Sequence, residues 1–314
     1  MTTRDPAFVG DATVELDQVS KWFGQKVAVS DVSCSFGPGL TGLLGPNGAG
    51  KTTMLRLLTG LLTPSKGTIR VLKEDPRTTP AVFGQVGLVP EEDATYGFLS
   101  GREFVTYSAR LSGKANPRLD AERALGEVGL LDDADRDVAG YSKGMKQRVK
   151  VAAALVHEPL VLVLDEPLNG TDPVQRAHLI SLFRHLADTG HTVIVSSHVL
   201  AEVEKMTDRI LAIVDGKLAA AGDIGAIRAA MADIPYRLKI STNDSRALAA
   251  RLIQEPTVES IAVQDESIHL ATRNLDDMGR AIATITRDLG VALTGYEPED
   301  ESLESVFRYL VERR

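Results

Sequence analysis

The stretch Gly45-Pro-Asn-Gly-Ala-Gly-Lys-Thr52 (GPNGAGKT) decides the fold of this 314-residue chain. It matches the pattern G-x-x-x-x-G-K-[ST], and it stands between a strand-like run, GLTGLL (39–44), and a helix-forming run, TTMLRLLTGLL (52–62). Glycines let the backbone curl tightly enough to aim several N–H groups at one phosphate chain. The sequence therefore predicts a phosphate-binding loop in an α/β fold.

Each part of this loop has a chemical task. Lys51 brings a positive charge to the β- and γ-phosphates, and Thr52 offers a hydroxyl to Mg²⁺. The helix that follows turns its positive N-terminal end toward the anion. A chance glycine-rich turn is the alternative, and the flanking strand and helix argue against it. We expect nucleotide contacts from Gly45, Pro46, Asn47, Gly48, Ala49, Gly50, Lys51, Thr52 and Thr53.

A second motif, LVLVLDEP (160–167), is an apolar strand that ends in two carboxylates. We expect Asp165 to hold Mg²⁺ through water, and Glu166 to orient or deprotonate the attacking water. Adjacent carboxylates also occur at ordinary solvated strand ends, but the phosphate loop makes that alternative the weaker one. Together the two motifs predict a Mg²⁺-dependent nucleoside triphosphatase.

Composition narrows the range of partners. A net charge of −8 argues against a general nucleic-acid binder, which needs a basic face. The single cysteine, Cys34, excludes an internal disulfide framework and fits a reducing compartment. It alternates with Val32 and Phe36, as a buried strand residue does.

The N-terminus shows no apolar signal segment. The most apolar zone is interrupted by HEP (157–159), short of the ~20 residues of a membrane span. A role at a membrane would therefore require docking onto another chain.

The chain is expected to form a core domain over residues 12–222 and a smaller domain over residues 235–314. In the core domain apolar strands alternate with helices, and a mainly helical insert at about 91–155 interrupts the strand series. Continuous apolar strands are typical of a sheet that is covered on both faces. The expected strands are 39–44, 67–72, 160–165, 191–197 and 209–215.

The smaller domain has the element order βαββαβ, which predicts a ferredoxin-like α+β fold. The expected strands are 236–242, two within 257–272 and one at 291–296, and the expected helices are 245–254 and 275–289. A last helix would carry one apolar stripe made of Leu303, Val306, Phe307, Leu310 and Val311. A dimer-stabilising arm, a regulatory ligand module and inert packing are the open roles for this domain, and we favour dimer support.

Five motifs follow one another in the order GLLGPNGAGKTT, YSKGMKQR, LDEP, LNGTDP and SSH. In this order they resemble the ATPase subunit of an ATP-binding cassette (ABC) transporter, over residues 12–222. The resemblance implies a P-loop NTPase core, ATP and Mg²⁺ as ligands, and two ATPase units stacked head to tail. Each ATP is then expected between the phosphate loop of one unit and the signature loop, YSKGMKQR (141–148), of the other.

Further site residues are implied by the same resemblance. Asp172 matches the loop that links the two sites, and His198 matches the histidine at the γ-phosphate. Phe23 matches the aromatic residue that stacks on adenine, with Trp22 or a core role as the alternatives. Taken alone, the signature loop would be interpreted as a capped, solvated helix start. Because it stands in order among the other four motifs, we interpret it instead as a phosphate-contacting loop. The resemblance places Ser142 and the Gly144 backbone at the γ-phosphate of the opposite unit, and it implies that Lys143 and Met145 also belong to the nucleotide site.

The sequence departs from the commonest family pattern at several positions. Lys143 and Met145 replace Gly and Gln, in a form that resembles the signature of bacterial exporters. Glu91 stands where the family has a glutamine near Mg²⁺ or water, and a carboxylate there is a hard oxygen ligand. We expect Glu91 to sense Mg-ATP and couple it to the insert, with a solvated loop carboxylate as the alternative. Thr171 replaces a usual leucine, and nothing in the sequence explains this change.

The resemblance implies the energy-coupling ATPase of a bacterial exporter. Such a chain would pair as a homodimer and bind a separate membrane-spanning permease at the cytoplasmic side of the cell membrane. The alternative is a soluble ABC ATPase that acts on ribosome or nucleic-acid complexes, but a single cassette and the lack of a sustained heptad repeat count against it. An inactive cassette is disfavoured because the loop lysine, both carboxylates and His198 are present. The transported substance would be selected by the permease.

Overall fold

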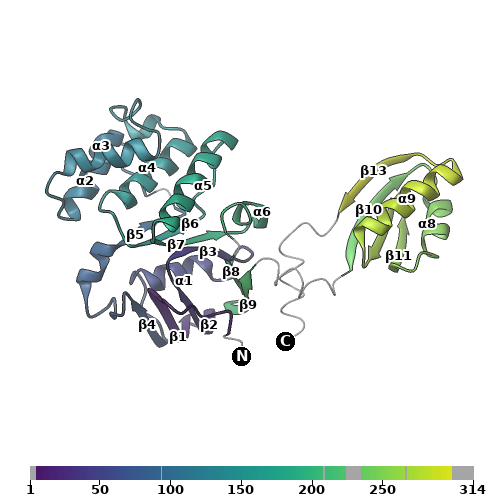
Figure 1. The fold of residues 1–314 in the computed structure, drawn as a ribbon, viewed down its shortest axis with the longest axis horizontal. Helices are drawn as coiled ribbons and strands as arrows, with labels where there is room; N and C mark the ends of the chain where they lie inside the picture. Colours follow the sequence, from purple (N-terminus) through teal and green to yellow (C-terminus); the bar gives the residue numbers. More distant parts are fainter. Residues whose placement is uncertain (1–4, 93, 208, 224–234, 266, 299–314) are drawn as a thin grey trace. The chain divides into compact units, whose positions relative to one another are not determined.

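The computed structural model describes residues 5–92, 94–207, 209–223, 235–265 and 267–298. The chain divides between residues 224 and 225 into two compact units (Figure 1). Within the described ranges, no helix has both the length and the apolar character that a bilayer crossing requires.

The first unit is built on a six-stranded sheet with the strand order β5-β6-β7-β3-β8-β9. Neighbouring strands are parallel except for β8 and β9, which are antiparallel. All residues of β6 and β7 are buried, as expected for strands covered on both faces. The strands are β3 Gly39–Leu44, β5 Val86–Val89, β6 Val161–Asp165, β7 Thr192–Ser197, β8 Arg209–Val214 and β9 Lys217–Asp223.

A smaller antiparallel sheet lies on the other side of helix α1 (Lys51–Leu58). Its strand order is β2-β1-β4, with β1 Val14–Phe23, β2 Lys26–Phe36 and β4 Lys66–Val71. Four apolar residues of α1 join both sheets in one core: Met54, Leu55, Leu57 and Leu58. Cys34 in β2 belongs to this core and is fully buried, as predicted. Burial raises the pKa of its thiol to about 12, against the opposing effect of the Arg209 guanidinium.

A helical insert connects β5 to β6. Its helices α2 (Gly101–Leu111), α3 (Pro117–Glu127) and α4 (Lys143–Leu155) pack against one another (Figure 1). Ser100 starts α2 with a capping box, in which its Oγ accepts the N–H of Glu103 and its own N–H donates to the Glu103 carboxylate. Two short 3₁₀ helices, Pro80–Gln85 and Val138–Gly140, precede β5 and α4.

The remaining helices of the first unit flank β7. They are α5 (Pro173–Asp188), which precedes β7, and α6 (Leu200–Val203), which follows it. The five strands expected for the core domain are all present, and their bounds differ from the prediction by one residue at most. Differences of this size are ordinary at the ends of elements.

The second unit contains β10 (Tyr236–Thr242), α8 (Ser245–Leu252), β11 (Val258–Gln264), β12 (Ser267–Thr272), α9 (Leu275–Leu289) and β13 (Leu293–Pro298). This is the expected βαββαβ order. The strands form an antiparallel sheet with the order β11-β12-β10-β13. The predicted face of α9 packs on it through Met278, Ile282 and Ile285. The expected last helix, with its stripe from Leu303 to Val311, lies outside the described residues.

Candidate nucleotide site

The phosphate-binding loop connects β3 to α1, and its glycines are required by the backbone. Gly48 and Gly50 have φ angles of 81° and 108°, which residues with a Cβ atom rarely adopt. A Cβ atom on Gly50 would lie 2.4 Å from the carbonyl oxygen of Ala28 in β2. One on Gly45 would lie 2.3 Å from the carbonyl oxygen of Ile213 in β8. The loop is therefore held closely between strands of both sheets.

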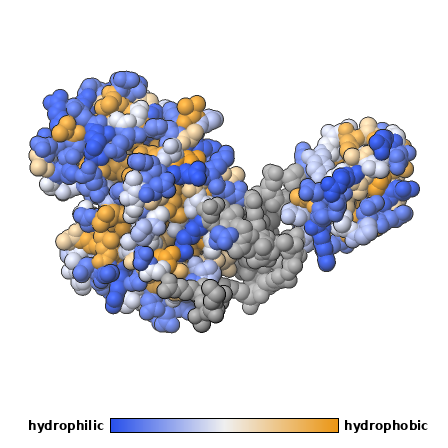
Figure 2. All heavy atoms as spheres, viewed as in Figure 1, coloured by the Kyte–Doolittle hydropathy of each residue, from blue (hydrophilic) through white to orange (hydrophobic). Residues whose placement is uncertain are grey.

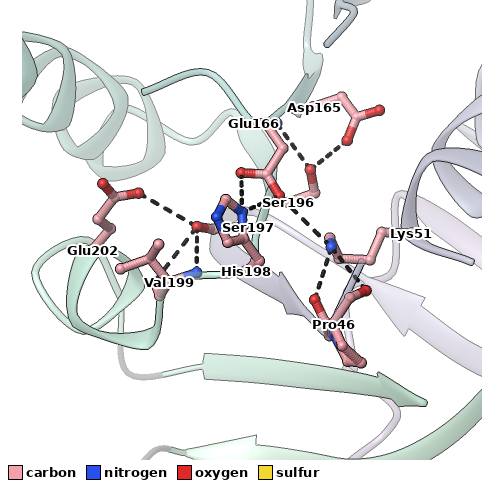
Figure 3. A network of polar contacts seen from close by, with 10 residues as sticks. Pro46, Lys51, Asp165, Glu166, Ser196, Ser197, His198, Val199 and Glu202 are labelled. Atoms are coloured by element: carbon pink, nitrogen blue, oxygen red, sulfur yellow. Dashed lines mark hydrogen bonds and ion pairs between the residues drawn. The ribbon is translucent and has the colours of Figure 1, made fainter. Parts of the chain in front are cut away.

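Lys51, the first residue of α1, is buried beneath this loop (Figure 3). Its Nζ donates hydrogen bonds to the carbonyl oxygens of Gly45 at 2.7 Å and Pro46 at 3.3 Å. A carboxylate oxygen of Glu166 lies 3.6 Å from the same nitrogen. A buried ammonium is stabilised by anions and charge-assisted hydrogen bonds, and a phosphate group supplies both. The residues of this loop therefore fit a polyphosphate ligand.

Ser196 connects the carboxylate of Asp165 to the backbone of Glu166 at the end of β6, and the sequence analysis did not identify it. Its Oγ donates to Asp165 Oδ1 at 2.5 Å and accepts the backbone N–H of Glu166 at 3.0 Å. Ser196 is fully buried and stands opposite Asp165 in the parallel pairing of β6 with β7. In the sequence, the only sign of this role was a hydroxyl at the end of an apolar strand. The role of Ser196 follows from the pairing of β6 with β7, which the sequence does not show.

Glu166 and His198 contact each other across the same strand ends (Figure 3). His198 Nδ1 lies 2.9 and 3.0 Å from the two carboxylate oxygens of Glu166, and it donates to them when the carboxylate is ionised, because an ionised carboxylate can only accept. Burial raises the pKa of Glu166 above its ordinary value, while the hydrogen bond from His198 and the charge of Lys51 act in the opposite direction. Glu166 is thus a buried carboxylate whose affinity for a proton is increased, as suits a general base.

Nine of the predicted site residues line one pocket of about 340 Å³, a size at the lower end of the range for small-molecule sites. Lys26 and Ala28 were not predicted and join it from β2. Five predicted residues do not line it but lie directly beside residues that do: Gly45, Pro46, Ala49, Asp165 and His198. The lining consists of Phe23, Lys26, Ala28, Asn47, Gly48, Gly50, Lys51, Thr52, Thr53, Glu91 and Glu166.

The aromatic residue at the pocket is Phe23 rather than its neighbour Trp22, which is absent from the lining. Phe23 ends β1 with about half of its surface exposed, so it is not a core residue. The ammonium of Lys21 lies 5.0 Å from the centre of its ring. An exposed ring at the mouth of a phosphate pocket is suited to stacking on a flat base.

The oxygen donors at the site suit a Mg²⁺ ion that binds together with a nucleotide. No group of three or more His, Cys, Asp or Glu side chains in the described part of the chain could hold a metal ion alone. Mg²⁺ usually binds through one or two carboxylates, waters and substrate phosphates. Thr52 and Glu91 line the pocket, and Asp165 stands next to Glu166 at the end of β6. This donor set fits the ion.

The remaining predicted residues lie outside the pocket: Ser142, Lys143, Gly144, Met145 and Asp172. Ser142 caps α4 by accepting the N–H of Met145 at 3.2 Å, and Asp172 caps α5 by accepting the N–H of Gln175 at 2.9 Å. The two helix starts are in contact, since a Cβ atom on Gly144 would lie 2.5 Å from Oε1 of Gln175 in the first turn of α5. Ser142, Lys143 and Asp172 are exposed, and the pocket of their own chain does not include them.

A phosphate loop after a central parallel strand, with a buried carboxylate pair on a strand two places along the sheet, defines a P-loop nucleoside triphosphatase. Residues 29–169 match the model of the family described as ABC transporter. The bacitracin transport ATP-binding protein BcrA of Enterococcus faecalis is 31% identical over 95% of this chain and 96% of its own length. The daunorubicin/doxorubicin resistance ATP-binding protein DrrA of Streptomyces peucetius is 32% identical over 93% of this chain and 95% of its own length.

Among solved structures, an ATP-binding subunit of an ABC transporter matches with a TM-score of 0.64 and 27% identity, over 70% of this chain and 93% of its own. The chain belongs to the ABC transporter family, as one of its ATP-binding proteins. It is an ATPase, and its cofactors are ATP and Mg²⁺.

Replacing Ser196 by alanine removes the donor to Asp165 and leaves the buried N–H of Glu166 without its acceptor. We expect the free energy of unfolding to fall by about 1–3 kcal/mol, the cost of an unsatisfied buried polar group. The ATPase rate should fall as well, because Asp165 loses its fixed orientation. Urea unfolding and a steady-state ATPase assay measure the two effects. The control is Ser181→Ala on the exposed face of α5, expected to change stability by less than about 0.5 kcal/mol. Equal losses in both variants would contradict the role of Ser196.

Replacing His198 by alanine should shift the pH dependence of hydrolysis. The ionised form of Glu166 is needed as base, so the rate is lost as the pH falls through the pKa of Glu166. His198 lowers that pKa, and its removal raises it further, which moves the acid limb of kcat/KM to higher pH. Initial rates at ATP concentrations well below KM, taken across the pH range, measure this limb. His185→Ala, remote from the pocket, should leave it in place. An acid limb that stays fixed or moves to lower pH in His198→Ala would refute the coupling.

Proposed function

We propose that this chain is the ATP-hydrolysing subunit of an exporter, in which two ATPase units pair head to tail around ATP and drive a separate membrane-spanning subunit. One observation carries the pairing: the pocket lacks the signature residues, of which Ser142 and Lys143 are exposed at the start of α4. The names of the similar proteins, which refer to bacitracin transport and to drug resistance, support export. Two copies of the same chain are the simplest pair.

In this proposal the residues of one unit bind and orient the triphosphate. The loop N–H groups and Lys51 hold the phosphates, and Phe23 stacks on the adenine. Thr52, Asp165 and Glu91 would hold Mg²⁺, which neutralises charge on the phosphates when bound. Glu166 accepts the proton of the attacking water on a carboxylate oxygen, and His198 keeps that carboxylate in place while it contacts the γ-phosphate.

The second unit would complete the site from the opposite side. Ser142, Lys143, Gly144 and Met145 begin α4, a helix of 13 residues whose N-terminal end favours an anion. Asp172 begins α5 beside them. Because the pocket of a single chain does not include these groups, ATP would be fully enclosed only when two units meet. Hydrolysis would then remove the γ-phosphate that both units hold, and the pair would open.

The membrane-spanning subunit would dock on aromatic residues that follow Glu91 in the chain. The rings of Phe98, Phe104 and Tyr107 surround Tyr96 at centroid distances of 5.9 to 6.3 Å. Phe98 is 80% exposed, and Tyr96 and Tyr107 are also exposed. Hydrophobic residues are also visible on the surface between the insert and the sheets (Figure 2). Exposed apolar clusters of this kind mark interaction sites. The docked chain would be held at the cytoplasmic side of the membrane.

Glu91 would report the state of the nucleotide to this docking region, because it lines the pocket five positions before Tyr96. We expect Glu91→Gln to change both the ATPase rate and the Mg²⁺ concentration at half-maximal rate, since a charged oxygen ligand is lost. Glu92→Gln is the matched control, because Glu92 pairs with Arg56 and does not line the pocket. If Glu91→Gln keeps both parameters, Glu91 is a solvated loop carboxylate.

The first experiment asks which protein the chain serves. Glu166→Gln should bind ATP but hydrolyse it slowly, so that the paired state accumulates. Tagged Glu166→Gln would be expressed in its own host, extracted in mild detergent with ATP and analysed by mass spectrometry. We expect a polytopic membrane protein in stoichiometric amount. Lys51→Ala, which should not hold ATP, is the control for nucleotide-dependent pairing. Ribosomal or DNA-associated partners, without a membrane protein, would refute the transporter assignment.

A further inference from the structure

An ion pair joins the start of α5 to the turn that carries His198. Arg176 Nη1 lies 3.1 Å from Glu202 Oε1. Arg176 stands in the first turn of α5, and its backbone N–H donates to the carbonyl oxygen of Asp172 at 2.8 Å. Glu202 belongs to α6, four positions after His198. The pair therefore connects the two segments that present Asp172 and His198.

The second carboxylate oxygen of Glu202 reaches the turn itself. Ser197 Oγ donates to Glu202 Oε2 at 3.4 Å and accepts the backbone N–H of Val199 at 3.0 Å (Figure 3). These contacts hold the chain on both sides of His198, and Ser197 is buried. From this turn the imidazole reaches the Glu166 carboxylate at 2.9 Å. The orientation of His198 thus depends on a side chain that does not touch the pocket.

Glu202 is more deeply buried than its partner Arg176, and this difference indicates how the ion pair affects the His198 turn. The side chain of Glu202 is 14% exposed, whereas that of Arg176 is 39% exposed. A carboxylate so far removed from water needs a partner, and without Arg176 it would have to find another or turn outward. An ion pair with one exposed member adds little to overall stability. Its effect would instead be on the position of the turn.

We propose that Arg176 and Glu202 are positioning residues for ATP hydrolysis, which hold the His198 turn in a fixed relation to the first turn of α5. The inference rests on the proposed roles of His198 and Asp172. Since Asp172 would face the opposite unit and His198 the nucleotide of its own unit, the pair joins the two faces of the chain. A displacement of α5 on pairing would then move the turn that positions His198 and the carboxylate of Glu166.

The test compares Arg176→Met and Arg176→Lys in the full-length chain, each with His198 intact and with His198→Ala. With His198 present, Arg176→Met should lower kcat about tenfold, an effect within the range seen for coupled networks. The KM for ATP and the melting temperature should remain nearly unchanged, and Arg176→Lys, which retains the charge, should keep most of the activity. In the His198→Ala chain, Arg176→Met should have no further effect, because no imidazole remains to be positioned.

Two further variants keep the outcome decisive. Glu202→Gln removes the charge from the other side and replaces Arg176→Met if that variant does not fold. Glu127→Gln disrupts the pair with Arg123, a contact of 2.7 Å in the insert between two side chains that are each about one-third exposed, and should leave kcat unchanged. An equal loss of kcat with and without His198 would overturn the inference, and so would an Arg176→Lys variant as slow as Arg176→Met. If His198→Ala alone keeps full activity, the proposed role of His198 fails first.

Discussion

Parallel pairing of β7 with both β3 and β6 is the constraint on which the rest of the site depends. Leu44 stands opposite Ser197, and Asp165 stands opposite Ser196, so that the three strands end at one edge of the sheet. The phosphate-binding loop follows β3, Glu166 follows β6 and His198 follows β7. These segments are far apart in the sequence, and the sheet order alone brings their functional groups together.

Once assembled, this edge holds opposite charges in a place with little water. Lys51 and Glu166 are both buried, and Lys51 Nζ lies 3.6 Å from a carboxylate oxygen of Glu166. Burial raises the pKa of Glu166, and His198 limits the increase. The arrangement lowers the stability of the ionised form and makes Glu166 a better proton acceptor. The same side chains that weaken the fold locally are those that suit the chemistry.

Local patterns were sufficient to predict the strands that lead into the motifs and the βαββαβ order of the second unit. They were also sufficient for the phosphate loop, because its glycines, lysine and flanking elements are contiguous. Ser196 was missed because its role depends on which strand lies beside β6. The pair of Arg176 and Glu202 was missed for a similar reason, since 26 positions separate residues that meet only when α5 and α6 flank β7. The sequence could not show which of Phe23 and Trp22 lines the pocket, because the pairing of β1 with β2 shifts its register between Lys21 and Trp22.

The close contacts between the phosphate-binding loop and the two sheets have a consequence for folding. Gly50 abuts β2 of the three-stranded sheet, and Gly45 abuts β8 of the six-stranded sheet. In the folded chain the loop is therefore packed against both sheets, and a partly assembled chain lacks one side of this packing. A ligand that binds the finished state alone stabilises that state by mass action. In a cell rich in ATP, the fuel of this protein therefore also favours completely folded molecules over partly assembled ones.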